Sequence, residues 1–77
     1  MNKTRRKEVL KILKSGWSAV NISNTIGLLF NIKGSEVLRL IQNAEWEHKR
    51  ILQVLDNFVI AKYPISKEYT ELYGVVE

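Results

Sequence analysis

The sequence predicts an all-α protein: a small bundle of three to five helices in a single domain, residues 1–77, with a long third helical segment. Apolar residues recur at spacings of three and four along most of the chain, which is the period of a helix with one buried face. The breaks between these stretches fall at glycine, serine and the single proline. A hydrophobic content of 45% with 26% charged residues, and no low-complexity run, indicates a globular chain.

The first helix is expected over about residues 4–15, with Asn2 or Thr4 as its N-cap. Ser15-Gly16 ends it, because glycine readily adopts the left-handed conformation found just past a helix. Basic side chains take the outer face. The inner face is the apolar set Val9, Leu10, Leu13 and Trp17.

A second helix is expected from the N-cap Ser18 to about Phe30, and Ser35 is the expected cap of the third. The apolar side of the second helix is Ala19, Ile22, Ile26, Leu29 and Phe30. The third stretch follows the seam Val37, Ile41, Ala44, His48, Ile51, Leu55 and Phe58, in which His48 is expected to be partly buried.

As one helix, residues 35–62 would be about 42 Å long, whereas a folded chain of this size is about 30 Å across. Either the helix breaks near residues 43–46, or residues 44–62 form a projecting helix that pairs with a second copy. Pro64 and Ser66 close the helical part, and the C-terminal tail, residues 64–77, carries a short helix or strand over 67–73.

Positive charge is concentrated at the N-terminus, where the arm and first helix, residues 1–14, contain six basic residues and one acidic residue, 6 − 1 = +5. The rest of the chain carries −1, because the total is +4. This asymmetry predicts an anionic partner, with nucleic acid first. A solubilising face, an anionic membrane surface and acidic proteins are the alternatives.

Cysteine is absent, which excludes disulfides and thiolate metal sites and is compatible with a reducing, cytoplasmic location. Apolar runs of four or five residues are far below the roughly 18 needed to span a bilayer, so a soluble protein without membrane contact is expected. No phosphate-binding glycine loop or histidine–nucleophile motif occurs, and His48 is the single histidine. We therefore expect no enzyme, no cofactor, no metal and no small-molecule substrate.

Residues 23–42 read SNTIGLLFNIKGSEVLRLIQ and contain a coherent set of turn and packing signals. Gly27 lets two helices approach closely, and Asn31 tolerates the positive φ of a tight turn. Ile32 anchors the turn, and Val37 packs the next helix back on the domain. Without a gap, this pattern resembles the helix-turn-helix of trihelical DNA-binding regulators, and with RRKEVLKILKSG before it the resemblance covers about residues 5–42; the helix-turn-helix itself spans 18–42.

The resemblance implies a transcriptional regulator that binds double-stranded DNA, with Gly34–Asn43 as the recognition helix in the major groove. A dimer formed through the second half of the long helix is expected. The implied base contacts are Ser35, Arg39, Gln42 and Asn43. The expected phosphate contacts are Arg5, Arg6, Lys7, Lys11 and Lys33.

Two residues on the expected DNA face favour a rival interpretation, since Leu38 is apolar and Glu36 is acidic. The rival is a protein-binding modulator on a helical scaffold, such as an antirepressor or an inhibitor of a partner protein, of the kind carried by mobile elements. Its candidate protein interface is Leu38, Trp46, Ile51, Leu55 and Phe58.

Overall fold

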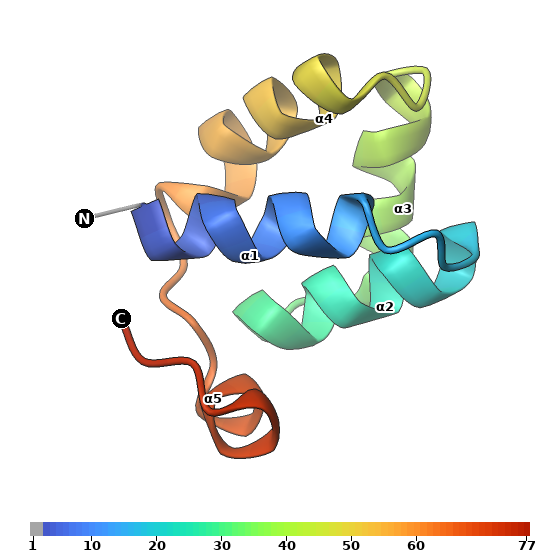
Figure 1. Ribbon diagram of the computed structural model, residues 1–77. Helices are drawn as coiled ribbons and strands as arrows, with labels where there is room; N and C mark the ends of the chain where they lie inside the picture. The colour runs from blue at the N-terminus through green and yellow to red at the C-terminus, as the bar shows by residue number, and fades with distance from the viewer. Residues whose placement is uncertain (1–2) are drawn as a thin grey trace.

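The computed structural model of this chain describes residues 3–77 and contains five α-helices and one π-helical segment (Figure 1). They are α1 (Lys3–Leu13), α2 (Ala19–Phe30), α3 (Gly34–Asn43), α4 (His48–Leu55), the π-helical segment η1 (Asp56–Ile60) and α5 (Lys67–Tyr73). Residues 3–77 contain no strand, so the predicted all-α bundle is confirmed. None of these helices is long and apolar enough to cross a bilayer.

The ends of the first two helices follow the predicted capping chemistry with small shifts. Asn2, one of the two predicted caps of α1, lies outside the described residues, and Thr4 lies within the helix instead of capping it. Gly16 has φ +80° in the turn after α1, as expected. Ser18 caps α2, since its hydroxyl accepts a hydrogen bond from the Asn21 N–H at 3.2 Å.

The long third stretch breaks into two helices, which settles the alternative between a break and a projecting helix. α3 ends at Asn43, and Glu45 and Trp46 follow with φ of 54° and 60°, values that no continuous helix contains. Glu47 then caps α4 by accepting from the N–H groups of Lys49 and Arg50. The break keeps the whole chain within 30 × 23 × 20 Å.

Four of the predicted cap and core positions are corrected. Lys33, not Ser35, occupies the N-cap position of α3 and makes no side-chain capping bond. Trp17 and Ala19 are exposed, because the chain turns at Gly16 before Trp17 can continue the buried face of α1. His48 is also exposed, since it begins a new helix beyond the break.

The π-helical segment changes which side chains after α4 face the core. Its wider turn, closed by the Ala61 N–H bonding the Asp56 carbonyl at 3.3 Å, advances the register by one residue. Val59 and Ile60 are therefore buried, whereas Phe58, predicted in the seam, is 56% exposed. The core combines side chains from all five α-helices and η1: Val9, Ile12, Leu13, Ile22, Ile26, Leu29, Phe30, Val37, Ile41, Ala44, Ile51, Leu55, Val59, Ile60 and Tyr69.

α5 is a helix, which decides the alternative left open for residues 67–73. Ser66 caps it and also donates from its backbone N–H to the Leu29 carbonyl at 2.7 Å, fixing α5 to the end of α2. The Tyr69 hydroxyl donates to the buried Glu8 carboxylate at 2.9 Å. Burial, and then the bond to Glu8, raise the pKa of Tyr69 well above its ordinary value, so the hydroxyl stays protonated.

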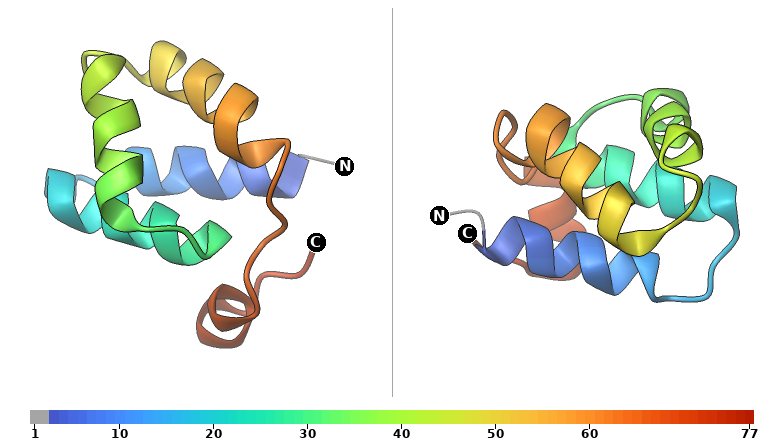
Figure 2. Two further views of the ribbon diagram at one scale, coloured as in Figure 1. Left: turned by 180° about the vertical axis from the view of Figure 1, so that it is seen from behind. Right: turned by 90° about the horizontal axis from the view of Figure 1, so that it is seen from above.

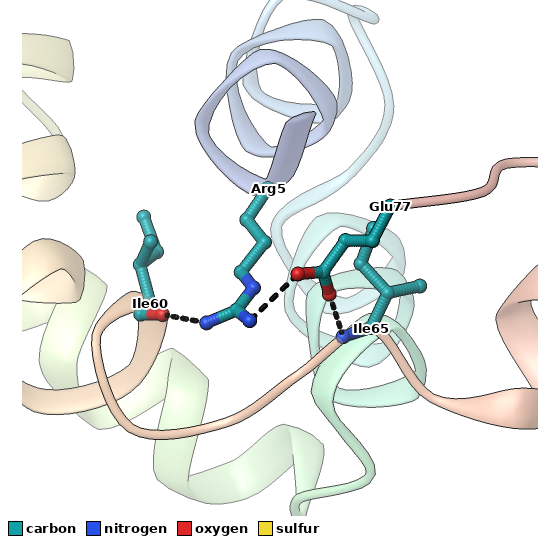
Figure 3. A network of polar contacts seen from close by, with 4 residues as sticks. All are labelled: Arg5, Ile60, Ile65 and Glu77. Atoms are coloured by element: carbon teal, nitrogen blue, oxygen red, sulfur yellow. Dashed lines mark hydrogen bonds and ion pairs between the residues drawn. The ribbon is translucent and has the colours of Figure 1, made fainter. Parts of the chain in front are cut away.

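Arg5 joins the N-terminal helix to the end of the chain (Figure 3). Its guanidinium donates to the Ile60 carbonyl at 2.8 Å and to the Glu77 carboxylate at 2.6 Å, while the other Glu77 oxygen accepts from the Ile65 N–H. These two hydrogen bonds, that from Arg5 first, lower the pKa of Glu77. Four segments of the chain thus meet in one polar network.

Candidate nucleic-acid interface

The turn between α2 and α3 has the geometry that its residue types require. Asn31 has φ 56° and ψ 46°, the left-handed conformation, and its N–H bonds back to the Gly27 and Leu28 carbonyls. A Cβ added to Gly27 would lie 2.7 Å from the Ile32 carbonyl oxygen, closer than side-chain carbons approach backbone. Only glycine at this position lets α3 start so close to α2.

α3 packs against α2 and α4 through one apolar face. Val37 and Ile41 on α3 are fully buried, and they meet Ile26 and Phe30 of α2 in the same core cluster. Because successive residues of a helix turn by about 100°, the side chains opposite Val37 and Ile41 must point away from the domain.

The predicted base-contacting residues all lie on that outward face of α3. They are exposed and share one side of the helix: Ser35, Arg39, Gln42 and Asn43. Glu36 lies at the edge of this face, where it lines a hollow of about 240 Å³ with Phe58 and Tyr63. Leu38, at the other edge, is half-buried. The acidic and apolar residues therefore flank the polar face and do not interrupt it.

The basic face of α1 lies on the other side of the molecule from α3. α1 packs against α2, α4 and η1, and the view from above shows α2 and α4 between α1 and α3 (Figure 2, right). Lys3, Lys7 and Lys11 follow one another at intervals of four residues and are exposed, directly opposite the buried Val9 and Ile12. One straight duplex against α3 cannot also lie on these lysines.

The residues predicted to contact phosphate therefore do not lie on one surface. Lys33 alone lies at the start of α3, whereas Lys7 and Lys11 belong to the opposite face. Arg5 is 16% exposed and is held in the network of Figure 3, and Arg6 pairs with Asp56 at 3.2 Å. These two arginines have internal partners, which the sequence alone did not indicate, because their partners lie more than forty residues away.

The candidate protein interface is also dispersed. Ile51 and Leu55 are fully buried in the core of their own chain, because the break after α3 turns α4 back onto the domain. They are core residues and not a seam for a second copy. Trp46 and Phe58 are exposed, and Leu38 is half-buried.

Exposed aromatic side chains that sequence reasoning missed lie on the α1 side. Trp17 is 48% exposed and Tyr73 51% exposed, and both line a cleft with Lys11. The position of Trp17 after Ser15-Gly16 could have indicated its exposure, because a residue beyond the end of a helix does not continue the buried face of that helix.

Comparison with protein-family models, curated proteins and solved structures gives no match for this chain.

Proposed function

We propose that the chain is a small helix-turn-helix protein that binds double-stranded DNA through the outward face of α3 and acts as a transcriptional regulator. One observation carries the proposal. Gly27 allows α2 and α3 to approach closely, Asn31 makes the tight turn between them, and α3 then presents an unbroken polar face of four exposed side chains. A helix held in this way fits the major groove, which is about 12 Å wide. The helices behind it supply rigidity.

Each side chain on the face has a chemistry suited to part of a duplex. Arg39 is central and is the candidate for a bidentate contact with guanine O6 and N7, and Gln42 or Asn43 for adenine. Lys33, exposed at the N-terminal end of α3, is the candidate for a phosphate contact. Since Ile51 and Leu55 are occupied in the core, the simplest form of the proposal is one copy on one site.

The test is selection of binding sequences from a randomised duplex library, followed by titration of the selected duplex at 50 and 200 mM salt. Arg39→Ala should weaken binding by 1–3 kcal/mol, or about 5- to 150-fold, and relax preference at one base pair. Arg50→Ala is the matched control, because Arg50 is an equally charged, exposed arginine on α4. If no sequence is enriched, or if both variants bind as the original chain does, the proposal is refuted.

A second candidate function, a protein-binding modulator, is favoured by the apolar border of the hollow beside α3. Phe58 is 56% exposed and Tyr63 41% exposed, and both face this hollow together with Glu36. Affinity capture from the native host, with and without nuclease, separates the candidates. A nuclease-resistant partner that disappears with Phe58→Ser and is retained with Gln42→Ala, which alters the DNA face but not the lining of the hollow, supports the second function.

A further inference from the structure

A cleft of about 310 Å³ is lined by residues of α1, the turn after it, α2 and α5, and by no residue of α3. Aromatic side chains dominate its wall: Trp17 and Tyr73 are about half exposed, and the buried Tyr69 lies behind Tyr73 with ring centroids 4.5 Å apart. The volume is at the lower end of the roughly 300–1,000 Å³ typical of small-ligand pockets. It is large enough for one flat ring system.

The walls of the cleft are held in place by hydrogen bonds. The Ser15 hydroxyl donates to the Ile12 carbonyl at 2.6 Å and accepts from the Trp17 N–H at 3.2 Å, so the turn that carries Trp17 is tied to α1. On the other wall, the bond from Tyr69 to Glu8 ties α5 to the same helix. A ligand that enters the cleft therefore meets aromatic rings carried on fixed backbone.

A row of positive charge leads into this cleft along α1. Lys3, Lys7 and Lys11 repeat about every 6 Å along the helix, since each residue rises 1.5 Å, and Lys14 follows on the same side. Within residues 3–77 none of these four lysines has an acidic side chain within 4 Å of its ammonium group. Lys11 belongs both to the row and to the lining of the cleft.

We propose that this second face, the lysine row and the aromatic cleft together, binds single-stranded nucleic acid. The lysines take the phosphates, and an unpaired base enters the cleft and stacks on Trp17 or Tyr73. The combination of a basic track with aromatic stacking surface is the one that single-stranded nucleic acid requires. A duplex supplies the same phosphates, but its paired bases cannot leave the stack to enter a cleft without unpairing.

This inference does not rest on the proposed function, because the two faces share no residue and lie on opposite sides of the molecule (Figure 2). If both are right, one molecule holds a duplex on α3 and a single strand on α1. Each can also hold while the other fails.

The experiment is a polarisation titration of a fluorescent twelve-nucleotide oligothymidylate with the full chain at 50–200 mM salt. Trp17→Ala should weaken binding at least about fivefold, and Trp17→Phe should restore most of it, since a ring remains to stack. Lys7→Gln with Lys11→Gln should weaken binding and reduce the slope of log affinity against log salt by about 1.4, or about 0.7 for each phosphate that is no longer neutralised. Thermal unfolding checks that each variant is folded.

Two controls make the outcome specific. Lys49→Gln with Arg50→Gln removes the same charge from α4 and should change oligothymidylate affinity less than twofold, as should Arg39→Ala on α3. In a Trp46→Phe background, the remaining fluorescence of Trp17 should be quenched by the oligonucleotide. The inference is overturned if the folded Trp17→Ala variant binds normally or if the α4 control weakens binding equally. It is also overturned if the lysine row binds vesicles containing phosphatidylserine but not the oligonucleotide.

Discussion

The α2–α3 unit and the segment after η1 are held together by different kinds of contact. In the α2–α3 unit, the turn and its packing involve residues within about twenty positions of one another, such as Gly27, Asn31 and Val37. The C-terminal segment is fixed by polar bonds to distant residues, from Tyr69 to Glu8 and from Glu77 to Arg5. Spacing rules therefore describe the first region, whereas the second depends on pairings that no local pattern contains.

The largest effect is expected from breaking the close approach in the α2–α3 unit. Gly27→Val places two extra methyl groups beyond a Cβ that already meets the Ile32 carbonyl oxygen at 2.7 Å. We expect a loss of about 3 kcal/mol in the free energy of unfolding, measured by urea denaturation. Sequence-selective duplex binding should be lost with it.

Gly74→Ala is the control for that substitution. Its added Cβ meets nothing within 4 Å, and its φ of 68° costs about 1 kcal/mol for a non-glycine residue. Equal losses for the two variants would show that helix contact at Gly27 is not the reason glycine is needed there.

The next effect tests the distant pairings through Tyr69. Tyr69→Phe leaves the buried Glu8 carboxylate without its hydroxyl donor, and we expect a loss of about 2 kcal/mol at pH 7. Tyr73→Phe, which alters an exposed hydroxyl on the same helix, should cost less than 0.5 kcal/mol.

The same pair of residues predicts a pH dependence. Because the pKa of Tyr69 is raised in the folded chain, its stabilising effect is complete below the ordinary tyrosine pKa of 10.0 and declines as the pH rises above it. The stability difference between the original chain and Tyr69→Phe should therefore shrink above pH 10. A difference that stays constant up to pH 11 would contradict the link between burial and this proton.

The contrast between the two regions also explains which features of the structure could be predicted from the sequence. Helix spacing and turn chemistry predicted the all-α fold, the cap at Ser18, the positive φ of Asn31 and the exposed side of α3. They could not predict that Arg5 is occupied by Glu77, because that pair spans 72 positions. The sequence therefore predicts a phosphate contact for Arg5, whereas its guanidinium binds the Ile60 carbonyl and the Glu77 carboxylate of its own chain.

The difference between the predicted and the observed positions of the apolar residues after α3 has another cause. The predicted apolar seam keeps one helical period from Val37 to Phe58, but the positive φ values of Glu45 and Trp46 and the wider turn of η1 each change the register. Phe58 consequently moved out of the core. Neither event is marked by glycine or proline, the residues by which helix breaks are usually found.

Removing the Arg5 network should have a smaller effect than removing the Tyr69 bond. Arg5→Met keeps an unbranched apolar stem but loses the bonds to Ile60 and Glu77, and we expect about 1.5 kcal/mol of destabilisation by thermal or urea unfolding. Glu77→Gln should cost only about 0.5 kcal/mol, since that carboxylate is partly exposed.

The pH dependence of stability at acid pH measures how much the ionised Glu77 carboxylate contributes to the stability of this network. The pKa of Glu77 is lowered in the folded chain, so its contribution is present above the ordinary value of 4.5 and is lost as the pH falls through the folded-state pKa. The difference between the original chain and Glu77→Gln should vanish at low pH. Lys7→Met, an exposed control on α1, should show no such change.

The smallest effect tests the left-handed residue that turns the chain between α2 and α3. Asn31→Gly should stabilise the fold by about 0.5 kcal/mol, because glycine adopts φ 56° without a Cβ clash, although its unfolded chain is more flexible. Asn31→Ala should destabilise the fold by about 1 kcal/mol, because the Cβ of alanine disfavours the left-handed conformation and alanine lacks the polar side chain that lets asparagine tolerate it. If both changes destabilise equally in urea unfolding, the asparagine side chain itself holds the turn, and the α2–α3 unit then depends on more than backbone conformation and packing.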